Sequence, residues 1–336
     1  STNTKGLYEL IWSPIEDHLM GIETIYFSPS GLLNQIPFAA LDTEGKPILA
    51  RQYNLVQLSS TYALAEKRSQ PKTDNTLFIG GIDYEYKPTE LNEDSEETVS
   101  ELAVLKSALG TRSLGTKWNY LPGTLKEVNT IESLFSKNNK TYSSLSASKA
   151  TETSFKRLSG NSPNVIHIAT HGFFFENPKT TTDDALNINQ ENVYKIAEDP
   201  LLRSGLLFSG ANYAWQNGNN PYTKDDGVLT ALEISNLDLS NTDLVVLSAC
   251  ETGLGDIDGS EGVYGLQRAF KMAGVDLIMM SLWEVPDEET SEFMSIFYTN
   301  WLNDQKVRTA FRNTQLEMST KYKNNPEKWA AFVLFE

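Results

Sequence analysis

Two stretches of the sequence, VIHIATHG at residues 165–172 and LVVLSACETG at residues 244–253, are apolar runs that end in a glycine. Their β-branched and aliphatic residues are typical of strands that are buried on both faces, as in a parallel sheet. His171 and Cys250 stand where each predicted strand gives way to a loop. Because the carboxyl ends of parallel strands meet at one edge of a sheet, neighbouring strands would bring this imidazole and this thiol together.

An imidazole beside a thiol is the arrangement that cysteine-dependent acyl transfer uses. The imidazole lowers the pKa of the thiol by favouring the thiolate, and it can protonate a leaving amine, as cysteine-dependent acyl transfer requires. The backbone N–H groups of Gly172 and Cys250 are candidates for stabilising an oxyanion, since a glycine lets a carbonyl group approach closely. A lone cysteine at a strand end is more often a small buried apolar residue, but the His-Gly at the equivalent end of the other strand favours catalysis.

A metal site is a weaker interpretation of the same residues. His167 and His171 have the spacing of helical zinc ligands, but their run is β-branched and no Glu follows His167 directly. In a strand the two histidines share one face, so we expect His167 to pack or hydrogen-bond inside the site. The loop DIDGSEG at residues 256–262 lacks both the calcium-loop pattern and the Gly-Lys-Ser/Thr of a phosphate loop. We therefore expect no metal and no cofactor.

The rest of the chain alternates between strand and helix patterns, which predicts a mostly parallel α/β sheet flanked by helices. Strands are expected at residues 23–28, 53–58, 76–83, 142–145, 164–170, 243–248, 275–282 and 329–335. Helices are expected at residues 99–109, 151–158, 262–272, 288–301 and 306–322, with another of about 14 residues beginning near Thr124. Thr124 and Glu127 have capping-box spacing, and the turn at residues 29–31 predicts a hairpin through residues 32–38.

Composition limits the class of protein. The chain has 336 residues, 40% hydrophobic and 21% charged, which is typical of one large globular domain or two small ones. Its net charge of −16 opposes binding to nucleic acid or anionic membranes and is typical of a soluble surface, with a basic partner as the alternative. The single cysteine excludes an internal disulfide, a cysteine-based zinc site and an iron–sulfur cluster. No run of about 18 apolar residues and no signal peptide is evident, so a cytoplasmic protein is expected.

The chain is expected to divide into an N-terminal α/β lobe at residues 1–75 and a core at residues 76–336. Within the core, the acidic residues 84–118 predict an exposed insertion. Residues 176–226, rich in Asn, Thr and Asp, predict a long loop that completes the site, or else a tolerated surface excursion. The chain starts at Ser1 without an initiator Met, so we expect a piece of a longer polypeptide from which neighbouring domains are missing.

Eight segments, in order along nearly the whole chain, resemble the CHAT domain. This is a caspase-like cysteine peptidase family whose clan also contains separase, and it often accompanies tetratricopeptide repeats. The segments are IPFAAL at 36–41, LPGT at 121–124, HIATHG at 167–172, SGLL at 204–207, LTALEI at 229–234, LSACETG at 247–253, SLWEVPD at 281–287 and WAAFVL at 329–334.

The resemblance implies a caspase-like, mostly parallel sheet with an N-terminal α/β extension. It implies His171 as general acid/base and Cys250 as nucleophile, in a dyad that needs no third member. The SLWEVPD segment looks like the separase stretch that helps to form the pocket for a basic P1 side chain. The resemblance makes Glu284 and Asp287 the candidates for this pocket, with Asp256 as a less favoured candidate. The alternatives are that Asp287 is the N-cap of a helix beginning at Glu288, and that the P1 pocket is apolar or unselective.

The function implied is that of an endopeptidase that cleaves a specific partner protein in a regulated bacterial defence or cell-death response. The substrate would be a gasdermin-like or CRISPR-associated effector, and a missing N-terminal region, such as tetratricopeptide repeats, would bind the trigger or the substrate. The competing class is a non-catalytic caspase-like interaction module. A nucleotide-binding domain is disfavoured, because Gly80 and Gly81 follow a strand without the G-x-G-x-x-G pattern.

Overall fold

The computed structural model describes residues 4–65, 70–87, 117–175, 197, 199–217, 225–249, 256–257, 263–303, 306–323 and 325–336. The predicted helix at residues 99–109 and the nucleophile candidate Cys250 lie outside the described residues. So does most of the acidic insertion predicted at residues 84–118.

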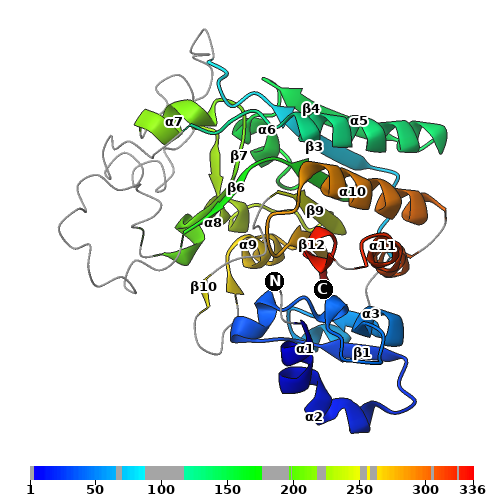
Figure 1. The fold of residues 1–336 in the computed structure, drawn as a ribbon. Coiled ribbons are helices and arrows are strands. Elements are labelled where there is room, and N and C mark those ends of the chain that lie inside the picture. Colours follow the sequence, from blue (N-terminus) through cyan, green and yellow to red (C-terminus); the bar gives the residue numbers. More distant parts are fainter. Residues whose placement is uncertain are drawn as a thin grey trace.

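An eight-stranded sheet runs through the molecule in the order β1-β2-β13-β12-β9-β5-β3-β4 (Figure 1). All neighbouring strands pair in parallel except β12 and β13, which are antiparallel. This confirms the predicted mostly parallel α/β fold. The strands are β1 (Thr24–Phe27), β2 (Asn54–Gln57), β3 (Thr76–Ile82), β4 (Tyr142–Ala147), β5 (Val165–Ala169), β9 (Leu244–Ser248), β12 (Leu277–Ser281) and β13 (Phe332–Phe335).

The strands β5 and β9, which lead to His171 and Cys250, are neighbours at the centre of this sheet. Every residue of β5 and of β9 is buried, as the unbroken apolar runs predict. Ala169 pairs with Ser248 across β5 and β9, and Met279 pairs with Val246 across β12 and β9. The carboxyl ends of these three strands therefore reach one edge of the sheet at the same level.

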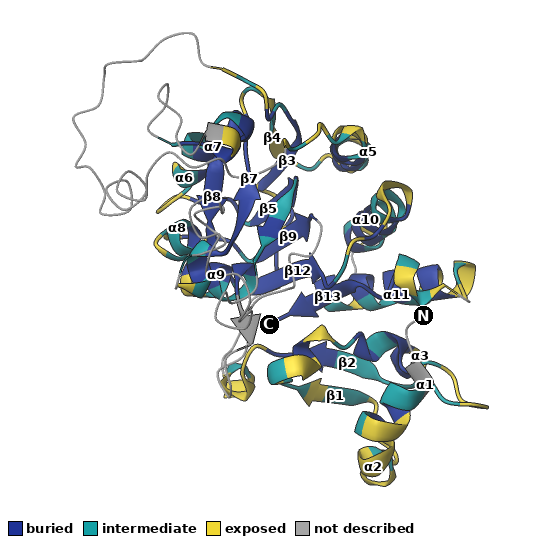
Figure 2. Cartoon of the chain, turned by 60° about the vertical axis from the view of Figure 1, so that its left-hand side comes forward, coloured by how far each residue is buried: buried dark blue, intermediate teal, exposed yellow. Residues whose placement is uncertain are grey.

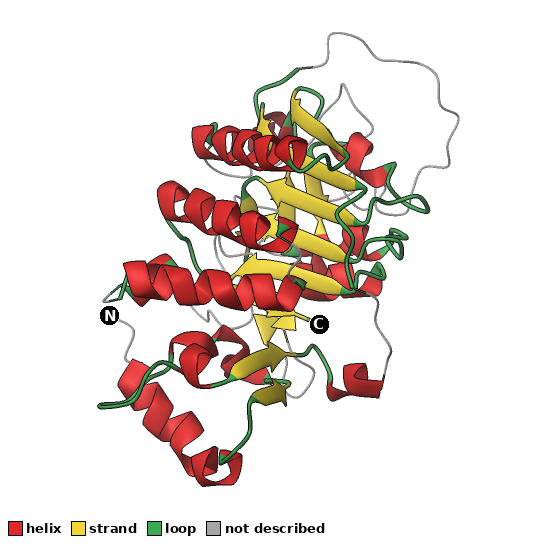
Figure 3. Cartoon of the chain, turned by 90° about the vertical axis from the view of Figure 1, so that its right-hand side faces the viewer, coloured by secondary structure: helices red, strands yellow, loops and turns green. Residues whose placement is uncertain are grey.

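Helices cover both faces of the sheet. On one face the three long helices α5 (Pro122–Lys137), α10 (Asp287–Leu302) and α11 (Val307–Lys321) lie side by side (Figure 3). Their apolar stripes bury Phe135, Phe293 and Phe297 against the sheet. The other face carries shorter helices, α6 (Glu152–Lys156), α7 (Ala211–Asn217), α8 (Ala231–Ser235) and α9 (Leu266–Met272). Figure 2 shows the central strands β5, β9 and β12 buried between the two layers.

Residues 176–226 are not one continuous loop. The described part contains a 3₁₀ turn (Pro200–Leu202), β7 (Ser204–Leu207) and α7. β7 is wholly buried between β6 (Gly172–Phe174) and β8 (Val228–Thr230) in a second, antiparallel sheet. The short run of β7 gives no periodic signal of its own, which is why the prediction was wrong here. A two-stranded sheet pairs β10 (Asp256–Ile257) with β11 (Val263–Tyr264).

The predicted hairpin in the N-terminal region is also wrong. β1 and β2 pair in parallel, and the chain between them forms 3₁₀ turns at Gly31–Gln35 and Phe38–Ala40 and the helix α3 (Leu49–Gln52). The apolar residues of this segment pack against Tyr8 and Trp12 in a core of their own. The remaining elements are α1 (Thr4–Leu7), a π-helical turn (Tyr8–Trp12), α2 (Ser13–Glu16) and 3₁₀ turns at Asp17–Leu19, Thr61–Ala65 and Pro326–Lys328.

The start of α5 differs from the predicted capping box. The N-cap residue is Leu121, and it makes no side-chain cap bond. Thr124 Oγ1 donates to the Leu121 carbonyl (2.8 Å) and accepts from the Gly81 N–H (3.0 Å). Glu127, predicted to reach back to the helix terminus, is only 3% exposed and points into the core. Tertiary contacts therefore take both side chains away from the local motif.

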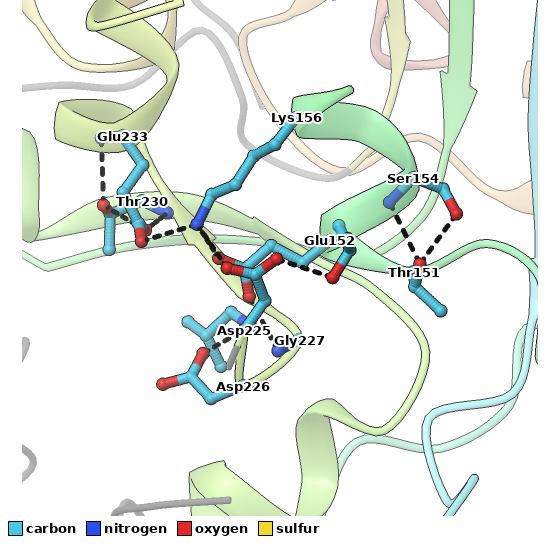
Figure 4. Close-up of polar contacts among 11 residues, drawn as sticks. Thr151, Glu152, Ser154, Lys156, Asp225, Asp226, Gly227, Thr230 and Glu233 are labelled. Carbon is cyan, nitrogen blue, oxygen red and sulfur yellow. Dashed lines mark hydrogen bonds and ion pairs between the residues drawn. The ribbon is translucent and has the colours of Figure 1, made fainter. Parts of the chain in front are cut away.

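An ion-pair cluster joins α6 to the chain that enters β8 and α8 (Figure 4). Lys156 Nζ lies 2.5 Å from Glu152 Oε1, 2.9 Å from Asp225 Oδ1 and 3.1 Å from Glu233 Oε1. Burial opposes the charge on Lys156, but the three carboxylates outweigh it and raise the pKa of the lysine. Glu152 also accepts from the Gly227 N–H at 2.8 Å. The cluster therefore anchors the start of β8, and with it the second sheet.

Candidate active site

His171 lies just beyond β5, where the chain leaves the large sheet. The strand ends at Ala169, and Thr170 Oγ1 donates to the Leu207 carbonyl of β7 (2.6 Å). The His171 backbone N–H donates to Tyr84 Oη at 3.3 Å. Tyr84 follows β3, the other neighbour of β5. Contacts from two sheets therefore turn the histidine out of the strand at the carboxyl edge.

The His171 ring is held by a backbone carbonyl. Its Nε2 lies 2.8 Å from the carbonyl oxygen of Asn119, in the segment before α5. Because a carbonyl can only accept, Nε2 carries the hydrogen, and Nδ1 is left as the nitrogen for proton transfer. The ring also packs against Trp118 and Tyr84, with centroid distances of 4.8 and 5.2 Å. A backbone carbonyl has no sequence signature, so this support could not be predicted.

The segment that carries Asn119 is itself held from α7. The Trp118 N–H donates to Asn212 Oδ1, and Asn212 Nδ2 donates back to the Trp118 carbonyl, both at 2.8 Å. Asn212 is 1% exposed, and its Nδ2 also lies 2.8 Å from Glu85 Oε1. The buried amide therefore fixes the backbone on which His171 rests.

Burial favours the neutral form of the His171 imidazole. Loss of hydration on burial is the largest effect, and it lowers the pKa of His171 below its ordinary value. The Asn119 carbonyl and the negative charges of Asp287 and Glu284 act in the opposite direction without reversing it. A neutral imidazole can accept a proton from a thiol, as a general base must.

Glu284 and Asp287 follow β12 and are both exposed. Because the carboxyl ends of β12 and β5 reach the same edge of the sheet, both residues follow β12 at the edge where His171 lies, and their negative charges raise its pKa. Asp287 is the first residue of α10, and the N-cap residue is Pro286 without a side-chain bond, so the N-cap alternative is wrong. The Asp287 carboxylate instead lies against Gly123 at the start of α5, where an added Cβ would come within 2.8 Å of its Cγ.

Gly172 is the first residue of β6. The hydrogen bonds from Leu207 N to His171 O and from Phe175 N to Arg203 O define the alternation of the β6–β7 ladder. By this alternation Gly172, which pairs with Leu206, falls in a non-hydrogen-bonded pair. The ladder therefore does not use the Gly172 N–H.

The chain is described up to the residue before Cys250. Ser248 Oγ donates to Glu127 Oε2 (3.0 Å), and the Ala249 carbonyl accepts from Ser281 Oγ (2.8 Å). Cys250, and with it one of the two proposed oxyanion N–H groups, lies outside the described residues. Asp256 begins β10, but its side chain is likewise outside the described part of the chain.

His167 does not join His171, contrary to the expectation from strand alternation. Its ring is fully buried between β5 and the helices, with Nε2 2.8 Å from Glu127 Oε1 and Nδ1 3.2 Å from Tyr298 Oη. The alternation fails because the strand ends at Ala169, before His171. Among the described residues, no group of three or more His, Cys, Asp or Glu side chains is arranged to hold a metal ion. In the same part of the chain, no helix has the length and apolarity needed to cross a membrane.

A family model described as the CHAT domain matches residues 3–336. The chain belongs to the CHAT-domain family. Two curated relatives of this CHAT domain, both named tetratricopeptide repeat protein 28, come from Mus musculus and Homo sapiens. Each is 33% identical over 108 residues, which is 32% of this chain and 4% of the relative. The match thus spans a small part of the curated relatives.

The fold of this CHAT domain is similar to those of several solved structures. The Arg-specific cysteine proteinase gingipain R superposes with a TM-score of 0.50 at 11% identity, covering 97% of this chain and 68% of that one. A complex of the Porphyromonas gingivalis RgpB pro- and mature domains gives 0.50 at 10% identity, covering 100% and 68%. The Saccharomyces cerevisiae separase–securin complex gives 0.49 at 12% identity, covering 92% and 15%. At these identities the similarity concerns the fold, which is caspase-like.

Proposed function

We propose that this CHAT domain is a cysteine endopeptidase with Cys250 as nucleophile and His171 as general acid/base. The observation that carries the proposal is the support of His171 by the Asn119 carbonyl at 2.8 Å, at the end of a strand adjacent to the cysteine-bearing strand. A backbone acceptor on Nε2 orients the ring and directs Nδ1 to the reacting groups.

The proposed reaction proceeds through a thioester. His171 Nδ1 takes the proton of the Cys250 thiol, and the thiolate attacks the scissile carbonyl. The oxyanion receives hydrogen bonds from the N–H groups of Gly172 and Cys250. The amine then leaves with the proton from His171, and a water molecule, deprotonated by His171, attacks the thioester to release the acid and the free thiol.

Glu284 and Asp287 are proposed to select a basic P1 side chain. Both carboxylates are exposed, and both act electrostatically on His171, so a cationic substrate group bound to them would lie beside the reacting bond. Glu284→Ala and Asp287→Ala are each expected to reduce cleavage of Lys/Arg peptide libraries and to spare residual cleavage of Leu/Met libraries. Full basic-P1 cleavage in both variants would overturn this assignment.

The proposed substrate is a specific partner protein, cleaved in a regulated bacterial defence or cell-death response. A gasdermin-like or CRISPR-associated effector is the substrate class that the family resemblance implies. The curated relatives are named for tetratricopeptide repeats, and this supports a regulatory repeat region in the whole protein. An unregulated endopeptidase would be toxic, so we expect such a region to bind the trigger or the substrate.

The test uses the single cysteine of the chain as a reporter. The rate of Cys250 alkylation is measured by intact mass against pH in the wild type, in His171→Ala and in His18→Ala, an exposed histidine of the N-terminal region. The wild type and His18→Ala are expected to react well at pH ~6, whereas His171→Ala requires a pH near the ordinary thiol pKa of about 8.5. An ordinary or unreactive thiol in all three proteins would favour the non-catalytic interaction module.

A further inference from the structure

Four buried polar side chains that the proposed reaction does not use form a network beneath the site. They are Glu127 of α5, His167 of β5, Ser248 of β9 and Tyr298 of α10, and none is more than 6% exposed. Two donors converge on the Glu127 carboxylate: His167 Nε2 at 2.8 Å from Oε1, and Ser248 Oγ at 3.0 Å from Oε2. Tyr298 Oη lies 3.2 Å from His167 Nδ1 and completes the chain of contacts.

Burying the Glu127 carboxylate is costly unless each of its oxygens has a hydrogen-bond partner. An ionised carboxylate loses several kcal/mol of hydration in a protein interior, and only partners with good geometry compensate for this. Here each carboxylate oxygen has its own donor from a different strand. Burial and the negative charge of Glu127 raise the pKa of Tyr298, so its hydroxyl stays protonated. Apolar residues could fill this space at less cost, which points to a use for the polar contacts.

The network reaches the chain two residues before the nucleophile candidate. Ser248 is the last residue of β9, and the next residue, Ala249, is held through its carbonyl by Ser281 Oγ of β12. Contacts from α5 and from β12 thus fix two consecutive residues, and Cys250 follows directly. The segment that supports His171 through Asn119 leads directly into α5. One helix is therefore connected to both the base and the nucleophile strand.

We propose that Glu127 is a positioning residue that fixes the end of β9 through Ser248 and thereby sets the position and reactivity of Cys250. The inference deepens the proposed function and rests on it for its catalytic meaning. The capping-box spacing of Glu127 in the sequence did not predict this use. In this role of Glu127, His167 holds one oxygen of the carboxylate while the other oxygen binds Ser248.

Two variants at opposite ends of the network separate positioning from simple stabilisation. Ser248→Ala removes the hydroxyl that links Glu127 to β9, and Tyr298→Phe removes the hydroxyl on the α10 side of His167. Each deletes one buried hydroxyl and leaves one partner unsatisfied, so comparable losses of melting temperature are expected. Glu127→Gln keeps the shape of the carboxylate but replaces one acceptor oxygen by a donor, so it can no longer accept both hydrogens.

The readouts are the alkylation rate of Cys250 against pH and hydrogen exchange of the peptide that follows Ser248. Ser248→Ala and Glu127→Gln are expected to slow alkylation near pH 6 by ~10-fold, since small displacements at a reacting group have effects of this size or larger. They should also speed exchange of that peptide, while Tyr298→Phe stays near the wild type in both. Equal effects of Ser248→Ala and Tyr298→Phe, or no effect of either, would overturn the inference.

The same measurements distinguish this inference from the proposed function. If the wild-type thiol titrates as an ordinary cysteine, the peptidase proposal fails. Selective changes in Ser248→Ala would then still show that Glu127 fixes the end of β9. If instead the wild type has an activated thiol that Ser248→Ala and Tyr298→Phe alter equally, the peptidase proposal stands and the positioning role fails.

Discussion

Asn212→Ala tests whether the support of His171 depends on the buried amide in α7. The substitution removes the two hydrogen bonds to the Trp118 backbone and the one to Glu85, all 2.8 Å long. At about 1 kcal/mol for each bond, the free energy of unfolding should fall by about 3 kcal/mol. The larger consequence concerns the site, because the carbonyl of Asn119, the residue after Trp118, would no longer be fixed under the His171 ring.

Loss of the Asn119 carbonyl should change both the pKa and the orientation of the His171 ring. The Asn119 carbonyl raises the pKa of His171, so its displacement should lower that pKa further and leave the ring without a fixed orientation. General acid–base catalysis contributes about 10²- to 10⁴-fold to the rate, and a misoriented base should forfeit ~10-fold or more of kcat/KM. The assays are urea unfolding, peptide cleavage and Cys250 alkylation.

Thr242→Val is the matched control. Thr242 is 1% exposed, and its hydroxyl makes two hydrogen bonds of 2.8 Å, to Ser162 and Pro163, at the amino end of β9. The control should lose stability but retain kcat/KM, because it lies at the end of the strand away from the site. If Asn212→Ala loses the expected stability and still cleaves and alkylates as the wild type does, the Asn119 carbonyl does not orient His171.

Three further outcomes are expected. In Glu284→Gln and Asp287→Asn, loss of a negative charge that raises the pKa of His171 should move the acid limb of the pH–kcat/KM profile to lower pH, and a shift to higher pH would contradict this. Lys156→Met leaves three carboxylates without their cation and should cost about 2 kcal/mol of unfolding free energy at pH 7, with the loss shrinking as the pH falls towards the ordinary carboxyl pKa of about 4. The same loss at pH 4 and pH 7 would refute the electrostatic origin. Gly123→Ala should lower the melting temperature although alanine favours helices, and pairing it with Asp287→Ala should restore the temperature, because the added Cβ meets the Asp287 carboxylate.

Local patterns predicted the elements with strong signals of their own. β5 and β9 were predicted to within one residue at each end, because five consecutive buried residues in each leave an unbroken apolar run. The long helices α10 and α11 were predicted to a similar accuracy from their amphipathic stripes. β7 was not, since its four residues are buried by strands that come from distant parts of the chain.

The residues of the site likewise divide into those with a local sequence pattern and those without one. His171 was found because a histidine before a glycine at a strand end is a visible pattern, and its place at the carboxyl edge follows from the parallel sheet. Asn119 was missed because its contribution is a backbone carbonyl, which every residue has. His167 was assigned to the wrong surroundings, because alternation was extended past the point where the strand ends.

By itself the sequence determined the fold class and the residue types available for chemistry, because burial on both faces and glycine at strand ends are local requirements. Only the tertiary structure decided what those residues contact. Glu127 has the spacing of a capping residue, but it lies under Ser248 and His167 because two strands brought together by the sheet supply donors that the helix terminus does not. Hydrogen-bond partners far apart in the chain compete with local ones, and packing decides between them.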